Sequence, residues 1–102
     1  MLRFVDLVSG KWAIPILYRL IVSGGPIRFS ELQRAVAPIT QKELTRHLRA
    51  FERKGLVERT VHAEVPVRVE YRVTGLGLTL EQPLAALADW ADAHSARLGG
   101  GH

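Results

Sequence analysis

The 102-residue sequence contains no cysteine, which excludes disulfides, thiolate metal sites and thiol chemistry within this chain. It also lacks an apolar run long enough to span a membrane, and its first residues show no secretory pattern, so we expect a cytoplasmic protein without a membrane partner. Its four histidines do not have the spacing of metal ligands. A glycine-rich phosphate loop and a nucleophile motif are missing as well. These absences predict no metal, no cofactor and no enzymatic activity.

Basic residues outnumber acidic ones, and their excess lies in the middle of the chain. The net charge is +4, with 14 Lys and Arg against 10 Asp and Glu. Segment 28–72 holds ten of these bases and six of the acids, whereas the remaining four bases and four acids balance. An anionic partner therefore suits the central segment. Apolar residues make up 47% of the chain, which is enough for one domain with a single modest core.

The most informative segment is TQKELTRHLRAFERK at 40–54, which has the pattern of a capped amphipathic helix. Thr40 and Glu43 form a capping box, and Gly55 follows the last turn as a C-cap. The apolar residues at helical spacing are Leu44, Leu48 and Phe51. The opposite face consists of Gln41, Lys42, Thr45, Arg46 and Arg49. Such side chains bond phosphates and base edges, which predicts a DNA-recognition helix; the alternative for this face is ordinary solvation.

The sequence before this segment predicts a helix-turn-helix. A nearly all-apolar pattern at 11–22 predicts the central buried helix, in which Pro15 indicates either a kink or a later start. A very short strand is expected at 27–29. Ser30 and Gln33 form a second capping box, which opens a helix of about seven residues before a tight turn.

The sequence after Gly55 predicts a wing and a closing helix. Alternating residues at 56–63 and 68–73 indicate a hairpin, with Pro66 in its turn. Thr74 caps a last long helix at 75–97. We therefore expect an α+β, mainly α, single domain over 1–102, a winged helix-turn-helix with flanking N- and C-terminal dimerisation helices. Its parts are a helix at 1–8, the helix-turn-helix at 30–54, the wing at 56–73, the helix at 75–97 and a flexible tail at 99–102.

Five stretches carry a family resemblance that covers almost the whole chain in order. They are DLVSGKW at 6–12, RFSELQRAV at 28–36, ITQKELTRHLRAFERKGLVERT at 39–60, EVPVRVEYRVTGLG at 64–77 and ALADWADAH at 86–94. With them the chain resembles the HxlR family of winged-helix transcriptional regulators, in the MarR-like superfamily. The resemblance implies a prokaryotic, dimeric, sequence-specific regulator that binds a pseudo-palindromic double-stranded DNA operator. The helix at 41–54 would enter the major groove, and the wing at 62–68 would lie on the backbone or in the minor groove.

Several members of that family sense oxidants or electrophiles through a cysteine just before the first helix. This chain begins with Leu2 and Arg3 after Met1 and has no cysteine. Either the sequence is truncated or this member does not sense through a thiol, so we do not expect thiol sensing. The operator, the regulated genes, the sign of regulation and any small-molecule effector do not follow from the sequence.

The helical face at 41–49 divides into base readers and phosphate contacts. Arg46 suits a bidentate contact to guanine, and Gln41 suits the corresponding contact to adenine. Lys42 and Arg49 suit phosphates. Thr45 belongs to the same face and completes the group that we expect to touch DNA.

Five further residues are candidate DNA contacts outside that helix. Arg28 and Ser30 lie at the start of the preceding helix, where phosphate contact competes with plain surface and capping roles. Arg68 at the wing turn is the minor-groove candidate. His62 either touches a phosphate or occupies a solvent-facing strand position. Lys11 is placed to reach the DNA backbone from the start of the central helix.

The first and last helices supply the expected homodimer interface. The candidate residues are Leu2, Val5, Leu84, Leu87 and Trp90. The alternative function is a winged helix that contacts another protein and does not bind DNA. That alternative predicts exposed apolar residues on the recognition face, whereas the face at 41–49 is basic and polar.

Overall fold

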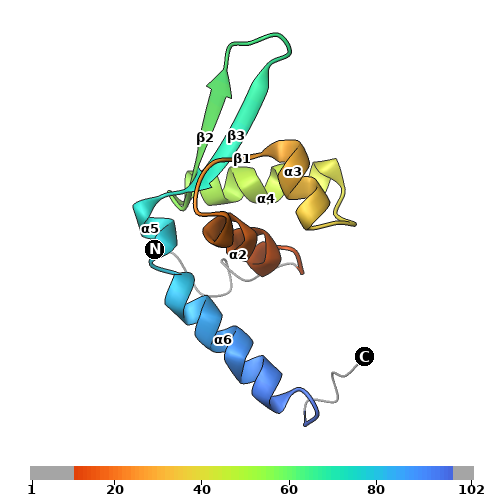
Figure 1. The fold of residues 1–102 in the computed structure, drawn as a ribbon, viewed down its shortest axis with the longest axis vertical. Coiled ribbons are helices and arrows are strands. Elements are labelled where there is room, and N and C mark those ends of the chain that lie inside the picture. Colours follow the sequence, from red (N-terminus) through yellow and green to blue (C-terminus); the bar gives the residue numbers. More distant parts are fainter. Residues whose placement is uncertain (1–10, 98–102) are drawn as a thin grey trace.

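The computed structural model describes residues 11–97 and confirms a mainly helical fold with a small antiparallel sheet (Figure 1). In chain order the elements are α2 (Ala13–Ser23), β1 (Ile27–Arg28), α3 (Phe29–Ala35), α4 (Gln41–Arg53), β2 (Val57–His62), β3 (Arg68–Val73), α5 (Gly75–Leu78) and α6 (Glu81–His94). Helices α3 and α4 with the β2–β3 hairpin form the winged helix-turn-helix that the sequence predicted. The helix expected at 1–8, with Leu2 and Val5, and the tail expected at 99–102 lie outside the described residues.

Helix α2 lies at the centre of the core, as its apolar composition predicted. It contacts α3, α4, α6 and β3, and its buried residues are Ala13, Ile16, Leu17, Leu20 and Ile21. Pro15 lies in the first turn because the helix begins at Ala13. The carbonyl of Lys11, which the proline ring would meet in a longer helix, therefore lies before the helix. Of the two outcomes that Pro15 predicted, the later start is confirmed.

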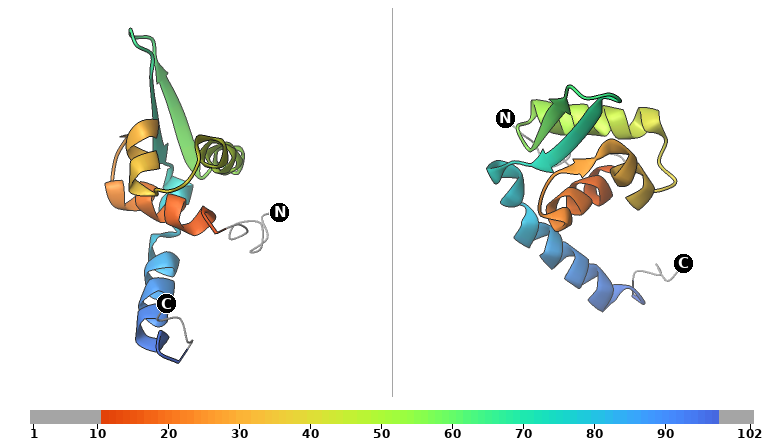
Figure 2. Two further views of the ribbon diagram at one scale, coloured as in Figure 1. Left: turned by 90° about the vertical axis from the view of Figure 1, so that its right-hand side faces the viewer. Right: turned by 45° about the horizontal axis from the view of Figure 1, so that its top comes forward.

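The sheet has the strand order β1-β3-β2, and both pairings are antiparallel. The hairpin is paired along its whole length, from Val57 at the base to His62 at the tip. On the other edge of β3, Ile27 of β1 pairs with Tyr71. Because β1 runs directly into α3, this pairing places the first turn of α3 beside the base of the hairpin. The hairpin projects from the body on the side opposite to α6 (Figure 2).

The predicted capping box at the start of α3 is wrong. The helix begins at Phe29 with Arg28 as its N-cap, so Ser30 lies inside the first turn. The backbone N–H of Arg28 donates to Oε1 of Glu31 at 3.1 Å, and this carboxylate has the role that we expected of Gln33. The Gln33 amide instead donates to the carbonyl of Ile39 at 3.3 Å, across the turn. Glu31 is the better acceptor for a helix N-terminus because it is charged.

The single closing helix expected at 75–97 is wrong, because the structure divides it into α5 and α6. Thr74 caps α5 as predicted, since its Oγ1 accepts from the N–H of Gly77 at 3.1 Å. Pro83 explains the break. In a continuous helix its ring would meet the carbonyl of Thr79, and a new helix that begins at Glu81 avoids this contact.

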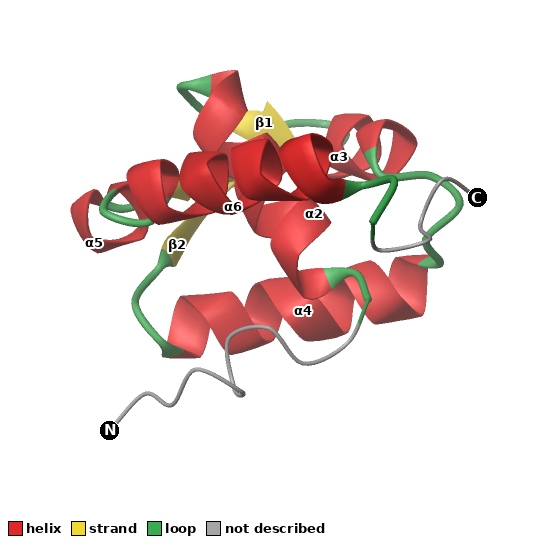
Figure 3. Ribbon diagram, turned by 90° about the horizontal axis from the view of Figure 1, so that it is seen from below, coloured by secondary structure: helices red, strands yellow, loops and turns green. Residues whose placement is uncertain are grey.

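Helix α6 packs on the body through its first turns only. Seen from below, α6 runs across α2 (Figure 3), and Leu84 is buried at this crossing with 8% exposure. Leu87 and Trp90 lie farther along and are 46% and 50% exposed. The burial of Leu84 is therefore a contact within one chain, whereas Leu87 and Trp90 remain on the surface.

Candidate nucleic-acid interface

Helix α4 has both of its predicted ends. The Oγ1 of Thr40 accepts from the N–H of Glu43 at 3.1 Å. At the other end Gly55 has a φ of 76°, the left-handed conformation that glycine adopts most easily. The N–H of Gly55 donates to the carbonyl of Glu52 at 3.0 Å, and the N–H of Leu56 donates to the carbonyl of Phe51 at 3.0 Å. These two bonds complete a Schellman motif, which fixes the helix and the direction in which the chain enters the wing.

The two faces of α4 separate as the sequence predicted. The buried face consists of Leu44, His47, Leu48 and Phe51. On the opposite face Gln41, Lys42, Arg46 and Arg49 are exposed and Thr45 is half-buried. The buried leucines and Phe51 hold the helix on the core. The polar side chains are therefore presented to solvent from a rigid support.

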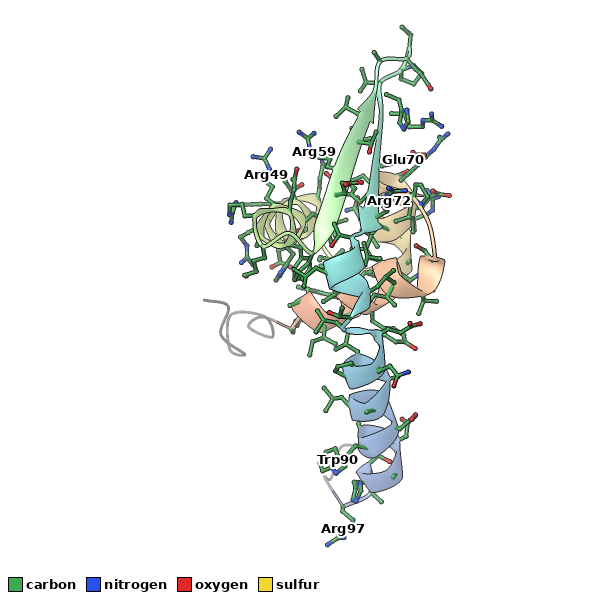
Figure 4. All side chains as sticks on the ribbon, turned by 90° about the vertical axis from the view of Figure 1, so that its left-hand side faces the viewer. Arg49, Arg59, Glu70, Arg72, Trp90 and Arg97 are labelled. Carbon is green, nitrogen blue, oxygen red and sulfur yellow. The ribbon has the colours of Figure 1, made fainter. Side chains whose placement is uncertain are left out.

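A groove of about 700 Å³ lies between α4, the start of α3 and the hairpin. Its polar lining includes Arg28, Ser30, Gln41, Thr45, Arg49 and Arg59, together with Glu64 and Arg68 from the outer part of the hairpin. Figure 4 shows Arg49 and Arg59 on the same side of the hairpin, whereas Glu70 and Arg72 lie on the other side. Lys42 and Arg46 are exposed on α4 outside this groove. The predicted residues at the starts of α3 and α4 are thus brought together, although they are more than ten positions apart in the sequence.

Arg59 is a groove residue that we did not predict from the sequence. It stands opposite Tyr71 on the hairpin, and its Nε lies 3.9 Å from Oε2 of Glu52. The strand alternation already placed Arg59 on one face with Val57 and Val61, which was the signal in the sequence. Tyr71 forms part of the groove as well, and burial raises the pKa of its hydroxyl above the ordinary value. The phenol therefore remains protonated, and can donate a hydrogen bond, at neutral pH.

Arg68 and His62 both lie on the wing, but their side chains contact acidic neighbours. Nη2 of Arg68 donates to Oε2 of Glu64 at 2.9 Å, and its Nη1 lies 3.7 Å from Oε2 of Glu70. Nε2 of His62 lies 2.8 Å from Oε1 of the same Glu70. These carboxylates offset the charge that Arg68 would present to a phosphate or a minor groove, although its guanidinium has further N–H donors. His62 is half-buried between strand neighbours, which agrees with the strand-position alternative.

Lys11 lies apart from the groove residues. It is exposed at the start of α2, and its Nζ lies 4.9 Å from the centre of the Trp12 ring. A contact between Lys11 and the DNA backbone stays a prediction.

His47 is the buried ionisable side chain on the core side of α4. It is 6% exposed, and its Nε2 has no hydrogen-bond partner among residues 11–97. Burial, together with the neighbouring charge of Arg46, lowers the pKa of His47 below its ordinary value of about 6.5, although Glu43 opposes this effect. Helix α4 therefore packs on the core through a histidine whose neutral form is favoured.

We expect the free energy of unfolding to decrease as the pH falls below about 6.5, in part because of His47. The lowered pKa means that the unfolded chain binds a proton more readily than the folded chain, so protons favour unfolding in this range. Above that range His47 is neutral in both the folded and the unfolded chain, so it no longer makes the free energy of unfolding depend on pH. Urea unfolding of the wild type and of His47→Leu at pH 7.5 and 5.5 measures it. The wild type should lose more stability than the variant, and equal losses would show that His47 does not contribute.

Metal-binding and membrane-spanning features are both absent from residues 11–97. No group of three His, Asp or Glu side chains is placed to hold a metal ion in this part of the chain. No helix within the same range is both long and apolar enough to cross a membrane.

Comparisons with known proteins identify the family to which the chain is similar. Residues 7–98 match the sequence model described as HxlR-like helix-turn-helix. The uncharacterised HTH-type transcriptional regulator YdeP of Bacillus subtilis is 39% identical over 94 residues, which cover 92% of this chain and 72% of YdeP. The reduced form of the redox regulator HypR is 37% identical with a TM-score of 0.84, over 93% of this chain and 92% of HypR. A transcriptional regulator of the MarR family from Enterococcus faecalis V583 is 36% identical with a TM-score of 0.75, over 93% and 84% of the two chains.

These relatives are transcriptional regulators and not enzymes, as the sequence predicted. The match spans nearly the whole chain and includes the caps, the buried face of α4 and the hairpin described above. This protein therefore belongs to the HxlR-like helix-turn-helix family of transcriptional regulators.

Proposed function

We propose that the protein is a dimeric regulator that binds specific sequences of double-stranded DNA. The observation that carries this proposal is the exposed polar face of α4 with Gln41, Lys42, Arg46 and Arg49, which continues into a groove lined by Arg28 and Arg59. Exposed bases on a rigid helix beside a hairpin are the arrangement expected of a major-groove reader. The excess of positive charge in segment 28–72 favours the same partner.

In this proposal α4 enters the major groove of the DNA. The walls of the protein groove between α4, α3 and the hairpin hold the DNA backbone. Arg46 projects outside the protein groove and is assigned to a guanine edge, with Gln41 assigned to adenine. Arg49, Arg59 and Arg28 are assigned to phosphates beside the hairpin. Ser30 lies in the first turn of α3, where backbone N–H groups favour a phosphate.

The competing function is a contact with another protein. It requires apolar side chains on the outer face of α4, and the exposed large apolar residues of 11–97 lie on other elements. A selection of duplexes from a random pool decides between the two functions. We expect the wild type to enrich a pseudo-palindromic sequence and to bind it more tightly than a scrambled duplex at the same salt concentration. If no sequence is enriched and no duplex is bound even at low salt, DNA binding is the wrong function.

We further propose that α6 joins two copies of the chain. Leu87 and Trp90 are half exposed on its apolar stripe beyond the last contact with α2, and Trp90 stacks on His94 with 4.8 Å between ring centres. A two-fold interface would remove these apolar side chains from water, which favours association.

Light scattering at micromolar concentration tests this assembly. The wild type should have the mass of a dimer, and Leu87→Glu should shift it toward the monomer because a carboxylate would be buried in an apolar interface. Ala85→Glu is the matched control, since Ala85 is exposed on the opposite side of α6 and should leave the mass unchanged. A monomeric wild type would exclude this interface, and equal effects of the two variants would place it elsewhere.

A further inference from the structure

Tyr71 has a buried ring and a hydroxyl without a partner in the described part of the chain. The residue is 8% exposed on β3, the central strand of the sheet. Its hydroxyl makes no hydrogen bond with any residue of 11–97. The fully enclosed polar side-chain atoms without a partner in that range are Nε2 of His47 and Nε of Arg68. The oxygen of Tyr71 is not enclosed in this way, so it opens to solvent.

The side chain of Tyr71 faces the groove between α4, α3 and the hairpin. Tyr71 stands directly opposite Arg59, and paired residues of this kind have their side chains on the same side of the sheet. Its chain neighbours Glu70 and Arg72 lie on the other side (Figure 4). The ring lies near that of Phe29 at the start of α3, with 6.3 Å between ring centres. Because Tyr71, Phe29 and Arg59 all line the groove, the hydroxyl opens into it.

The hydroxyl lies among charged side chains that attract an anion. Burial raises the pKa of this hydroxyl most, and the charges of Arg59, Glu52 and Arg49 act on it as well. Arg49 and Arg59 line the same groove, and Glu52 offsets part of the charge of Arg59 from 3.9 Å. An anion drawn to the two arginines would therefore meet a neutral O–H donor beside them.

The hydroxyl does not contribute to the stability of the fold, and its position is fixed. The largely buried oxygen loses part of its hydration, and no hydrogen bond within 11–97 replaces the lost one. Phenylalanine would fill the same space without this penalty. The ring is held by the sheet and by Phe29, so its donor loses little conformational freedom when a ligand binds. A donor placed in this way is suited to a ligand that enters the groove.

We infer that the hydroxyl of Tyr71 donates a hydrogen bond to a phosphate oxygen of the DNA backbone in the groove. This inference rests on the proposed function and adds a contact that differs in kind from those of the arginines. Arg49 and Arg59 neutralise phosphates, so their contribution falls as the salt concentration rises, whereas a neutral donor releases no counterion. A contact at a fixed depth also determines how α4 is seated on the duplex.

Tyr71→Phe tests the contact, because it removes the hydroxyl and keeps the ring. Tyr18→Phe is the matched control, since Tyr18 lies on α2 outside the groove. Each protein is titrated across a salt series with the duplex that the wild type selects. Tyr71→Phe should bind about tenfold more weakly at each half-site, with an unchanged slope of log K against log salt. Its free energy of unfolding should equal or exceed that of the wild type, and Tyr18→Phe should bind as the wild type does.

The second arm of the test changes the DNA one phosphate at a time. In each modified duplex a methylphosphonate replaces a single phosphate, so that an uncharged methyl group takes the place of one oxygen. At one phosphate in each half-site, this change and Tyr71→Phe together should weaken binding by less than the product of their separate effects, because both remove the same hydrogen bond. At the other phosphates the two effects should multiply.

Four outcomes would overturn the contact while the proposed function stands. The first two are full affinity of Tyr71→Phe and a loss of affinity with a smaller salt slope, which would mean that an arginine had been displaced. The third is a marked loss of stability, which would show that the hydroxyl has a partner inside the protein. The fourth is the absence of any phosphate at which the two changes overlap. A wild type that selects no duplex contradicts DNA binding itself.

Discussion

Replacing Arg46 with alanine is expected to weaken binding to the selected operator by about 1–3 kcal/mol at each half-site. The guanidinium is exposed on α4 outside the groove, so it is accessible for a bidentate contact to a guanine edge. Its removal should hardly change binding to a scrambled duplex, because non-specific binding depends on phosphate contacts. The measurement is titration of operator and scrambled duplexes over a series of salt concentrations.

Lys42→Ala is the matched control, since Lys42 is an exposed base on the same helix. It should weaken binding to both duplexes alike and reduce the salt slope by about one unit for each phosphate that the protein no longer neutralises. If Lys42→Ala affects only the operator while Arg46→Ala affects both duplexes, the two roles are reversed. If neither variant changes binding, α4 is not the recognition helix.

Gly77→Ala should lower the free energy of unfolding by about 1–3 kcal/mol, which is typical of overpacking. A Cβ at this position would collide with the carbonyl oxygen of Leu56 and would lie 2.7 Å from Cγ2 of Val73. That carbonyl already accepts a 3.0 Å hydrogen bond from the N–H of Thr74, so it is not free to move. The close approach joins α5 to the end of α4 and to the base of the hairpin.

Gly75→Ala provides the control within the same helix. No atom lies within 4 Å of the position its Cβ would take, so this change should leave stability equal or raise it by up to about 0.5 kcal/mol. Thermal and urea unfolding of both variants measure the difference. Equal stability of the two variants would show that α5 does not approach Leu56 closely in solution.

Local features of the fold could be predicted from the sequence, because their causes lie within a few residues. Thr40 and Gly55 mark the two ends of α4, and the hydrogen bonds at these ends span only three to five positions. The alternation of the wing residues likewise specified the hairpin. Pro83 was equally local evidence for the break between α5 and α6. It was overlooked because apolar residues recur at helical spacing from Leu76 to Trp90, which favours one continuous helix.

The arrangement of the groove could not be predicted in the same way. The pairing of Ile27 with Tyr71 joins segments that are far apart in the sequence, and this pairing brings Arg28 next to the hairpin. The identity of the exposed α4 residues followed from helical spacing alone. The contact of His62 with Glu70 depends on the register of the hairpin. The two carboxylates that hold Arg68 lie only four and two positions from it, so its pairing was local evidence that the prediction of a free arginine overlooked.

The break between α5 and α6 has a mechanical consequence for a dimer joined through α6. Thr79 and Leu80 connect the winged helix-turn-helix to α6, the helix that would bind the second copy of the chain. If α6 rotates by a few degrees relative to the winged helix-turn-helix, α4 of the second copy moves by a larger distance, because it lies far from the point of rotation. The tolerated spacing between half-sites would then depend on this junction and on the packing of Leu84 against α2, and a stiffer junction would narrow the range of operators that one protein can bind.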